Sequence, residues 1–400
     1  MNPFSQTYVK LPITQEANPL KWHPGHAIWM APGMWTSAQS RNQLFNVDIP
    51  AIVAAGATAP HIQIHVYWND IEPTSPGVYN WDFIDSKIAL INNSPSGNVL
   101  GASKCKFMIN FLCRTYGGFS SSVPAYMQSA AGTAYAGSTG GTNESRNGEY
   151  KGADLVNSQG VVTGRQFQAK LWVQDVADRY RDAVIAIGQR YDSNPDFVGM
   201  TINETALLGG VSTGMTPVDP RTSVDVSGDC FNKWANAVIA AKSAFPTTPM
   251  TWMANFPAAG ILSIFDPADF NPTIQARMLA AGIGGHEQDF YPRSGIVGQT
   301  LNVSYDANDA MAGITPRFTN MSNMGSLHSS NGNKANPTPP ATVSQLAQEA
   351  RARGVNIILW HVVATVSGES GDKWRQKILP LLLANNPSER PSDTFPSYFA

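Results

Sequence analysis

The sequence is poor in cysteine and in charged residues. Its 400 residues include only three cysteines, Cys105, Cys113 and Cys230, an odd number that forms neither a disulfide framework nor a zinc-ligand spacing. Charged residues make up 14% of the chain, the formal net charge is -2, and no run of Lys or Arg occurs. This composition argues against a nucleic-acid partner, and we expect neither a metal nor another cofactor.

Long apolar runs are also absent from the sequence. No window approaches the length of a membrane span, and residues 1–20 lack the charged and apolar regions of a signal peptide. We therefore expect no membrane partner and a cytoplasmic or phage-associated protein; the sequence leaves the oligomeric state open. The ten Trp and twelve Tyr suit a neutral, hydroxyl-rich ligand, although buried core aromatics explain most of them equally well.

Short β-rich segments alternate with segments of helical periodicity. Strands are predicted at 26–30, 61–68, 104–112, 197–204, 250–256, 282–290 and 355–363, with a weaker one at 314–318. Helices are predicted at 41–55, 82–91, 167–190, 231–245, 272–281, 342–353 and 373–383. Eight strands alternating with helices indicate an α/β fold, a (β/α)8 TIM barrel, rather than an open doubly wound sheet. No Gly-rich phosphate loop follows the first strand, which lowers the case for dinucleotide binding.

The pattern also predicts the domain boundaries. We expect an extended segment at 1–25, a barrel domain at 26–385 and a tail at 386–400. Residues 114–164 and 294–340 are rich in Gly, Ser, Thr and Asn and look irregular. Such stretches are usually binding loops, lids or inserts, so the barrel should carry long loops after strands three and six.

The strand ends supply the candidate chemistry. In a parallel barrel the carboxyl ends of the strands share one mouth. Glycoside cleavage requires two carboxyl groups: one protonates the leaving oxygen, and the other attacks the anomeric carbon or activates water. The predicted mouth offers acids, amides, His and Trp, namely Trp29, Trp68, Asn69, Asp70, Arg114, Asn203, Glu204, Asn255, His286, Glu287, Asp289, Tyr291, Trp360 and His361.

Two motifs carry a resemblance to a known family. Residues 68–85, with Trp68, Glu72-Pro73 and a Gly-x-Tyr at 77–79, resemble the second-strand segment of the clan A (β/α)8 retaining glycoside hydrolases, especially the β-galactosidase-like families. Asn203-Glu204 is similar to the Asn-Glu pair at the end of the fourth strand of that clan. The resemblance implies that Glu204 is the acid/base and that Asn203 binds the sugar 2-hydroxyl.

The resemblance extends to further substrate-binding positions. It implies that Trp360 stacks on a sugar and that Arg114 forms an ion pair with the catalytic Glu, although a surface Arg is an equal alternative. His286, Asp289 and Tyr291 would correspond to sugar-binding residues of the sixth strand. We expect Trp29 and Trp68 to act as further platforms, and Glu72 to brace the second loop.

One feature departs from the clan pattern. The nucleophile of the clan is a Glu at the end of the seventh strand, and residues 294–348 contain no Glu. Either the strand count is off by one, or the nucleophile has moved or been lost. Glu287 is the nearest replacement, and Asp289 is the second choice.

The sequence leaves three functions open. The first is a glycosidase acting on an oligo- or polysaccharide, with Glu204 as acid/base and Glu287 as the second carboxylate. The second is a barrel that binds carbohydrate without cleaving it, for example a receptor-binding or scaffold protein of a phage. The third is a metal-dependent hydrolase that uses His286, Asp289 and His361.

Overall fold

The structure is a computed structural model of the chain. It describes residues 20–30, 32–94, 104–115, 120–128, 148–156, 159–171, 173–204, 218–219, 224–225, 227–254, 274–287, 317–320, 342–362 and 374–395. Most of the predicted 1–25 segment therefore lies outside the described residues. So does nearly all of 288–341, which includes the expected loop after strand six.

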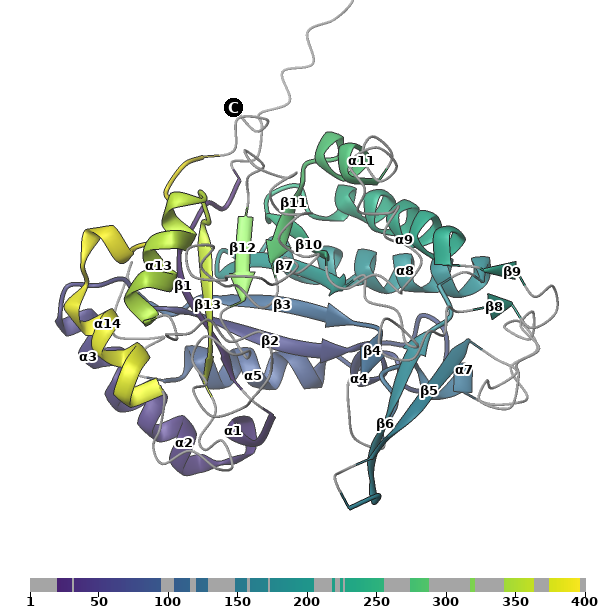
Figure 1. Ribbon diagram of the computed structural model, residues 1–400, viewed down its shortest axis with the longest axis horizontal. Helices are drawn as coiled ribbons and strands as arrows, with labels where there is room; N and C mark the ends of the chain where they lie inside the picture. The colour runs from purple at the N-terminus through teal and green to yellow at the C-terminus, as the bar shows by residue number, and fades with distance from the viewer. Residues whose placement is uncertain are drawn as a thin grey trace, which may run out of the picture.

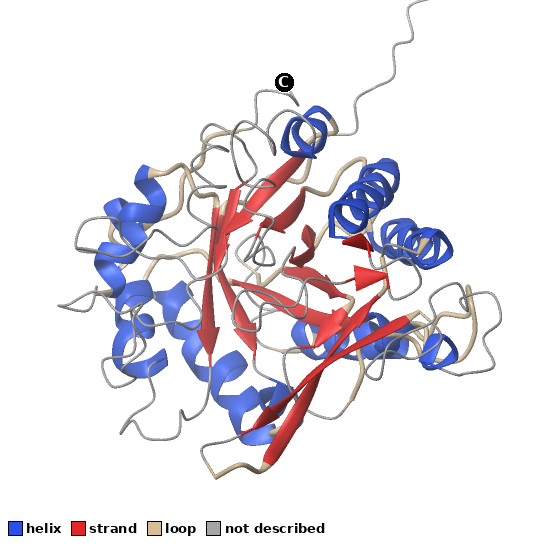
Figure 2. Ribbon diagram, turned by 45° about the vertical axis from the view of Figure 1, so that its right-hand side comes forward, coloured by secondary structure: helices blue, strands red, loops and turns tan. Residues whose placement is uncertain are grey.

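Eight parallel strands close into a barrel, which confirms the predicted TIM barrel (Figures 1 and 2). Neighbouring strands pair in parallel all the way round, from β1 to β2 on one side and from β1 to β13 on the other. In barrel order the strands are β1 (Gly25–Met30), β2 (His61–Tyr67), β3 (Phe107–Leu112), β7 (Phe197–Glu204), β10 (Met250–Ala254), β11 (Ile283–Glu287), β12 (Arg317–Asn320) and β13 (Ile357–Val362).

Helices surround this barrel (Figure 2). The predicted helix at 41–55 is a run of three pieces, α2 (Ala38–Gln43), η1 (Leu44–Asp48) and α3 (Ile49–Ala54). It ends near Gly56, which has a φ of +83°. The other long helical segments are α5 (Asp82–Asn92), α8 (Gln174–Tyr191), α9 (Ser227–Ala241), α11 (Ile274–Ala280), α13 (Val343–Ala352), and η5 (Trp374–Ile378) continued by α14 (Leu379–Ala384).

Local sequence explains where the helices begin and which faces they bury. In α8 the apolar positions Val176, Tyr180, Val184 and Ile187 are all buried, as their spacing predicts. At α13 the Thr342 hydroxyl accepts from the Gln345 backbone N–H at 3.2 Å, and the Gln345 side chain accepts in return from the Thr342 N–H at 2.9 Å. This reciprocal capping satisfies two backbone donors at the helix start.

The segment after β3 differs from the prediction. Instead of an irregular loop it contains an antiparallel sheet in the order β4–β6–β5, built from β4 (Arg114–Thr115), β5 (Glu149–Val156) and β6 (Val162–Ala169). The hairpin of β5 and β6 projects from the barrel on the side toward which β2 and β3 point (Figure 1). The predicted helix start at Phe167 is wrong, because Phe167 pairs with Thr115 and Lys151 in β6. The prediction failed because the spacing of Phe167 and Leu171 is also that of two residues on one face of a helix.

Two apolar clusters hold the barrel. The larger lies between the strands and the helices and includes Ile28, Ile202, Trp252 and Ile358. The smaller consists of Ala27, Met108, Val198, Ile357 and Leu359, with Trp29 against it. Since strand residues alternate between faces, the second cluster fills the barrel interior, and the polar residues on the same face of each strand also point inward.

Candidate active site

Glu204 and Glu287 lie at the carboxyl ends of two strands of the barrel. Glu204 is the last residue of β7, the fourth strand, and Glu287 is the last residue of β11, the sixth. Because all eight strands are parallel, both positions lie at the mouth to which TIM-barrel active sites are confined. The side chains of Asn203, Glu204 and Glu287 lie outside the described part, so their catalytic and binding roles stay predictions.

The pairing of β7 with β10 shifts register just before Glu204. Ile202 pairs with Trp252, but the next pair joins Glu204 to Met253, so Asn203 is the extra residue of a β-bulge. On its other side Met253 pairs with His286 of β11. Glu204 and His286 therefore flank Met253 at one level of the barrel.

A band of polar side chains crosses the barrel interior beneath this level. His65, Asn110, Thr201 and Thr251 are aligned residue by residue on β2, β3, β7 and β10, and we call them the polar row. The Thr201 hydroxyl lies 3.2 Å from both the Thr251 hydroxyl and Nδ1 of His286. Thr201, Thr251 and His286 are all buried. Burial lowers the pKa of His286 to about 3, so its imidazole is neutral.

The other half of the polar row supports Trp29. His65 Nε2 lies 3.0 Å from the Gln63 side-chain oxygen and 3.1 Å from the Asn110 amide nitrogen. The Trp29 ring stacks on His65 with centroids 4.7 Å apart. Trp29 is half-buried, whereas Gln63 and Asn110 are buried. Of the Trp residues predicted at the mouth, Trp29 alone keeps exposed surface that a sugar ring could contact.

Trp68 and Trp360 are packed in the core instead. Both are fully buried in the cluster between barrel and helices. The Trp68 indole donates to Glu72 at 2.7 Å, and the Trp360 indole donates to Nδ1 of His26 at 3.0 Å. Neither ring has a face free for a sugar, so this placement argues against the predicted platform roles of Trp68 and Trp360.

Glu72 braces the second loop, as expected. Its buried carboxylate accepts from the Trp68 indole, the Gly77 backbone N–H and the guanidinium of Arg179 on α8. Burial alone would lower the pKa of Arg179, but the charge of Glu72 together with hydrogen bonds to Tyr126, Tyr79 and Glu72 holds the pKa above its ordinary value. The residues of the clan-like motif thus fix a loop to a helix.

The remaining predicted residues are placed only in part. Arg114 is buried in β4, directly after β3, and stays a candidate neighbour of the mouth. Asp289 and Tyr291 lie outside the described residues, as does the side chain of His361. Among the described residues, no three His, Cys, Asp or Glu side chains group as metal ligands. A metal site of His286, Asp289 and His361 stays an untested prediction, because the side chains of Asp289 and His361 are not described.

The strand count removes one explanation for the missing nucleophile. β12 is the seventh strand both along the chain and around the barrel, and it ends at Asn320. The sequence contains no Glu between Glu287 and Glu349. The absence of a Glu after the seventh strand is thus a property of this chain and not an error of counting.

Sequence reasoning missed the inward-facing polar side chains. Gln63, Asn110, Thr201 and Thr251 each alternate with buried apolar residues, as in the run Met200-Thr201-Ile202. A period-two pattern with polar residues on one face and core residues on the other was the available signal.

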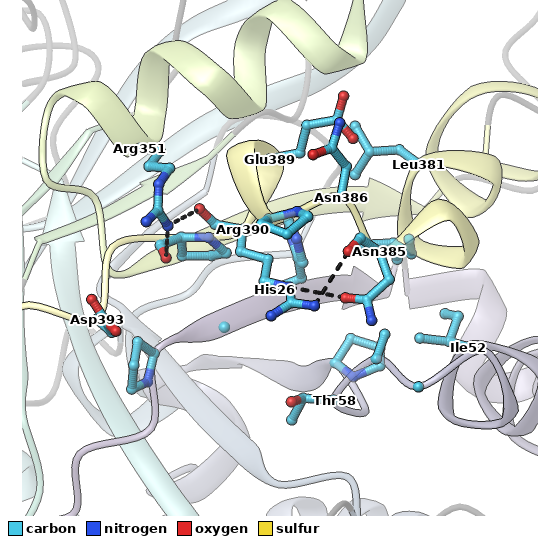
Figure 3. A pocket seen from close by; sticks show the side chains of 18 residues that line it. His26, Ile52, Thr58, Arg351, Leu381, Asn385, Asn386, Glu389, Arg390 and Asp393 are labelled. Carbon is cyan, nitrogen blue, oxygen red and sulfur yellow. Dashed lines mark hydrogen bonds between the residues drawn. The ribbon is translucent and has the colours of Figure 1, made fainter.

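A separate pocket of about 290 Å³ lies at the opposite end of the barrel, where β1 begins (Figure 3). Arg351, Arg390 and Asn385 line it, and Arg390 is held by the Asn385 side chain at 3.0 Å. None of the predicted catalytic residues is among its lining residues.

Within the described residues, no helix has both the length and the apolar character to cross a bilayer.

Comparisons with known proteins give distant likenesses of fold. No protein-family model matches the chain, and no curated protein matches it. The endoglycoceramidase II of Rhodococcus sp. in a cellobiose-like imidazole complex is 13% identical, with 87% of this chain and 74% of that chain covered and a TM-score of 0.46. The catalytic domain of β-amylase from Paenibacillus polymyxa is 10% identical, with coverages of 90% and 99% and a TM-score of 0.47.

A third solved structure shows the same level of similarity. The β-galactosidase of the psychrophilic Marinomonas ef1 is 10% identical, with coverages of 84% and 53% and a TM-score of 0.47. All three TM-scores lie below 0.5, so neither reaction nor substrate transfers from these enzymes to this chain. The barrel itself is established by its strand pairing.

Proposed function

We propose that the protein is a glycoside hydrolase that cleaves an O-glycosidic bond of an oligo- or polysaccharide at the carboxyl end of its barrel. Glu204 protonates the glycosidic oxygen as the bond breaks and later removes a proton from water. Asn203 binds the sugar, and Trp29 provides an aromatic surface for it. Arg114, Asp289 and Tyr291 complete the substrate contacts. The low charge of the chain suits a neutral glycan.

The observation that carries this proposal is the register shift at the end of β7. Ile202 and Trp252 both face the helices, so Met253 belongs to the inward face of β10. Strict alternation after Ile202 would turn position 204 outward. The extra residue Asn203 instead brings Glu204 level with Met253, and an inward carboxylate at this level is part of the proposal. Bulges are common next to active sites because they re-aim a side chain in this way.

Glu287 is the proposed second carboxylate. Glu204 and Glu287 are separated by one intervening strand, β10, which puts their backbones roughly 10 Å apart at about 4.8 Å per strand. Carboxyl groups act in retaining hydrolysis at about 5–5.5 Å and in inverting hydrolysis at about 6.5–9.5 Å, both within reach of two Glu side chains from that spacing. The role requires β11 to bend at its last residue, since His286 already occupies the inward position.

Activity measurements on single variants test the proposal. Wild-type protein, Glu204→Gln and Glu287→Gln are assayed on a panel of aryl glycosides and polysaccharides. Glu349→Gln serves as the matched control, because Glu349 lies on α13 in an ion pair with Arg353. We expect turnover by wild type and control, and losses of about 100-fold or more in both mouth variants. Equal activity of Glu204→Gln and wild type would refute the acid/base role.

A second function is favoured by one observation. The seventh strand ends at Asn320 without a carboxylate, the position at which the clan carries its nucleophile. A barrel that binds carbohydrate without cleaving it accounts for that loss. In this case a glycan binds to wild type and to Glu204→Gln with equal affinity, and no sugar is released from any substrate in the panel.

A further inference from the structure

One side-chain contact joins the two strands that end in the proposed acids. Thr201 lies on β7, three residues before Glu204, and His286 lies on β11, directly before Glu287. The Thr201 hydroxyl and His286 Nδ1 are 3.2 Å apart. Because β10 runs between β7 and β11, this contact spans the inner face of a whole strand.

The contact also crosses the level at which the register changes. Thr201 pairs with Thr251, two residues before Met253, whereas His286 pairs with Met253 itself. The imidazole therefore reaches back from the level of Glu204 to the level below the bulge. The bond therefore links β7, at a residue before its bulge, to β11 on the far side of β10.

We propose that the Thr201–His286 bond is a positioning element that fixes the bulge at the end of β7 and, with it, the separation of the Glu204 and Glu287 carboxyl groups. The inference rests on the proposed function for its catalytic consequence, but the positioning itself is a property of the fold. Thr201 and His286 are therefore positioning residues, not sugar ligands. This differs from the sugar-binding role expected for His286 from the sequence.

Burial makes such a bond strong enough to set geometry. Thr201 is 0% and His286 is 1% exposed, so water cannot replace either partner. The imidazole is neutral, since burial lowers its pKa to about 3, and its Nδ1 can accept from or donate to the hydroxyl. In enzymes, a misplacement of about 1 Å costs up to roughly 100-fold in rate.

Thr251 provides a matched control for this bond. It is also 0% exposed, it lies at the same level one strand away, and its hydroxyl is likewise 3.2 Å from that of Thr201. The contact between Thr251 and Thr201 joins adjacent strands that are already paired along their backbones. Replacing Thr251 with Val removes a buried hydroxyl of the same kind without cutting the link to β11.

The test compares Thr201→Val, Thr201→Ser, His286→Asn and Thr251→Val by steady-state kinetics and thermal unfolding. We expect Thr201→Val to lower kcat about 10- to 100-fold with KM changed less than about threefold. Thr201→Ser keeps the hydroxyl, and His286→Asn keeps a polar atom near Nδ1, so both should recover most of kcat. Thr251→Val should keep kcat within about threefold while its Tm still falls, by no more than that of Thr201→Val, which loses the contacts to both Thr251 and His286. Equal kcat losses in the two Val variants, or an unchanged kcat in Thr201→Val, would overturn the inference.

A second readout separates this inference from the proposed function. If wild type cleaves no glycoside, the function fails, and amide hydrogen exchange at residues 202–204 and 252–254 then tests the positioning alone. Faster exchange in Thr201→Val than in Thr251→Val supports the fixed bulge. Equal exchange in the two variants contradicts it, whatever the protein catalyses.

Discussion

Acid should unfold this protein steeply, because several of its histidines are buried or half-buried in the neutral form. His26 accepts the Trp360 indole N–H on Nδ1, and His61 Nε2 lies 2.9 Å from the His23 carbonyl oxygen. Burial lowers the pKa of His26 to about 3 and that of His61 to about 4. Together with His286, also at about 3, these side chains are uncharged at neutral pH inside the fold.

The sign of the effect follows from proton counting. Unfolded histidine titrates near a pKa of about 6.5, so near pH 5 each of the three takes up about one proton on unfolding. Their stabilising contribution is complete above pH 6.5 and is lost as the pH falls toward the folded values. Burial also lowers the pKa of the half-buried His23 to about 4, so up to four protons are taken up, a loss of about 4–5 kcal/mol per pH unit in the free energy of unfolding.

Asp70 acts in the opposite direction over part of this range. Burial raises its pKa to about 6, although the Tyr67 backbone N–H donates to it at 2.8 Å and opposes the shift. Near pH 5 unfolding therefore releases about one proton from Asp70. The net uptake of about two to three protons leaves a slope of roughly 3–4 kcal/mol per pH unit, large against a typical total stability of about 5–15 kcal/mol.

Urea unfolding at pH 7, 6, 5.5 and 5, followed by circular dichroism, measures this slope. His61→Gln and His26→Asn keep a polar atom in place of the hydrogen-bonding ring nitrogen and remove the titrating group. Each should reduce the slope by about 1.4 kcal/mol per pH unit. A free energy of unfolding that is flat between pH 6.5 and 5, or a slope unaffected by either substitution, would refute the assignment of buried neutral histidines.

Further predictions concern the braces of the fold. Glu72→Gln removes the buried charge partner of the half-buried Arg179, which keeps only its more exposed ion pair with Asp182, so it should lower the free energy of unfolding by about 2–3 kcal/mol in urea titrations. Asp178→Asn, which breaks a more exposed ion pair with Arg181, should cost under about 1 kcal/mol, and similar values for the two variants would contradict this. Asn356 is buried and donates to the Ser392 carbonyl oxygen at 3.0 Å. Asn356→Ala should therefore lower the free energy of unfolding by about 1–3 kcal/mol and speed proteolysis of the C-terminal tail. An unchanged Tm with an uncleaved tail would contradict this role of Asn356. Gly188→Ala would bring a Cβ to 2.5 Å from the Ala244 carbonyl oxygen, so it should destabilise by about 1–3 kcal/mol despite the better helix propensity of Ala; a higher Tm would show that the contact relaxes freely.

Much of the barrel could be predicted from local patterns. All eight predicted strands are present. The run from Phe197 to Ile202, for example, is rich in apolar residues because the outer face of β7 is covered by helices. The β4–β6–β5 sheet could not be predicted in the same way, since the pairing of Thr115 with Phe167 joins residues far apart in sequence. Periodicity reports which face is buried, not which strand is the neighbour.

The site was predictable in its chemistry more than in its geometry. Asn203-Glu204 could be assigned to a strand end because polar residues close an apolar run. Trp68 and Trp360 were assigned to the mouth by position, yet both pack between the barrel and the helices. Trp68 begins the short helix α4 (Trp68–Ile71), and Trp360 lies on β13, where a shift of one residue reverses the face. The same sensitivity hid the register shift before Glu204, which no composition or spacing reveals.

The acid role of Glu204 is tested most directly by leaving-group dependence. Wild type and Glu204→Gln are compared on glycosides of one sugar, with dinitrophenol as a leaving group that needs no proton and an alkyl alcohol or sugar that does. The account predicts a loss in kcat/KM of about 100- to 10,000-fold on the poor leaving group and a far smaller loss on dinitrophenol. Equal losses on both substrates, or none on either, would contradict it.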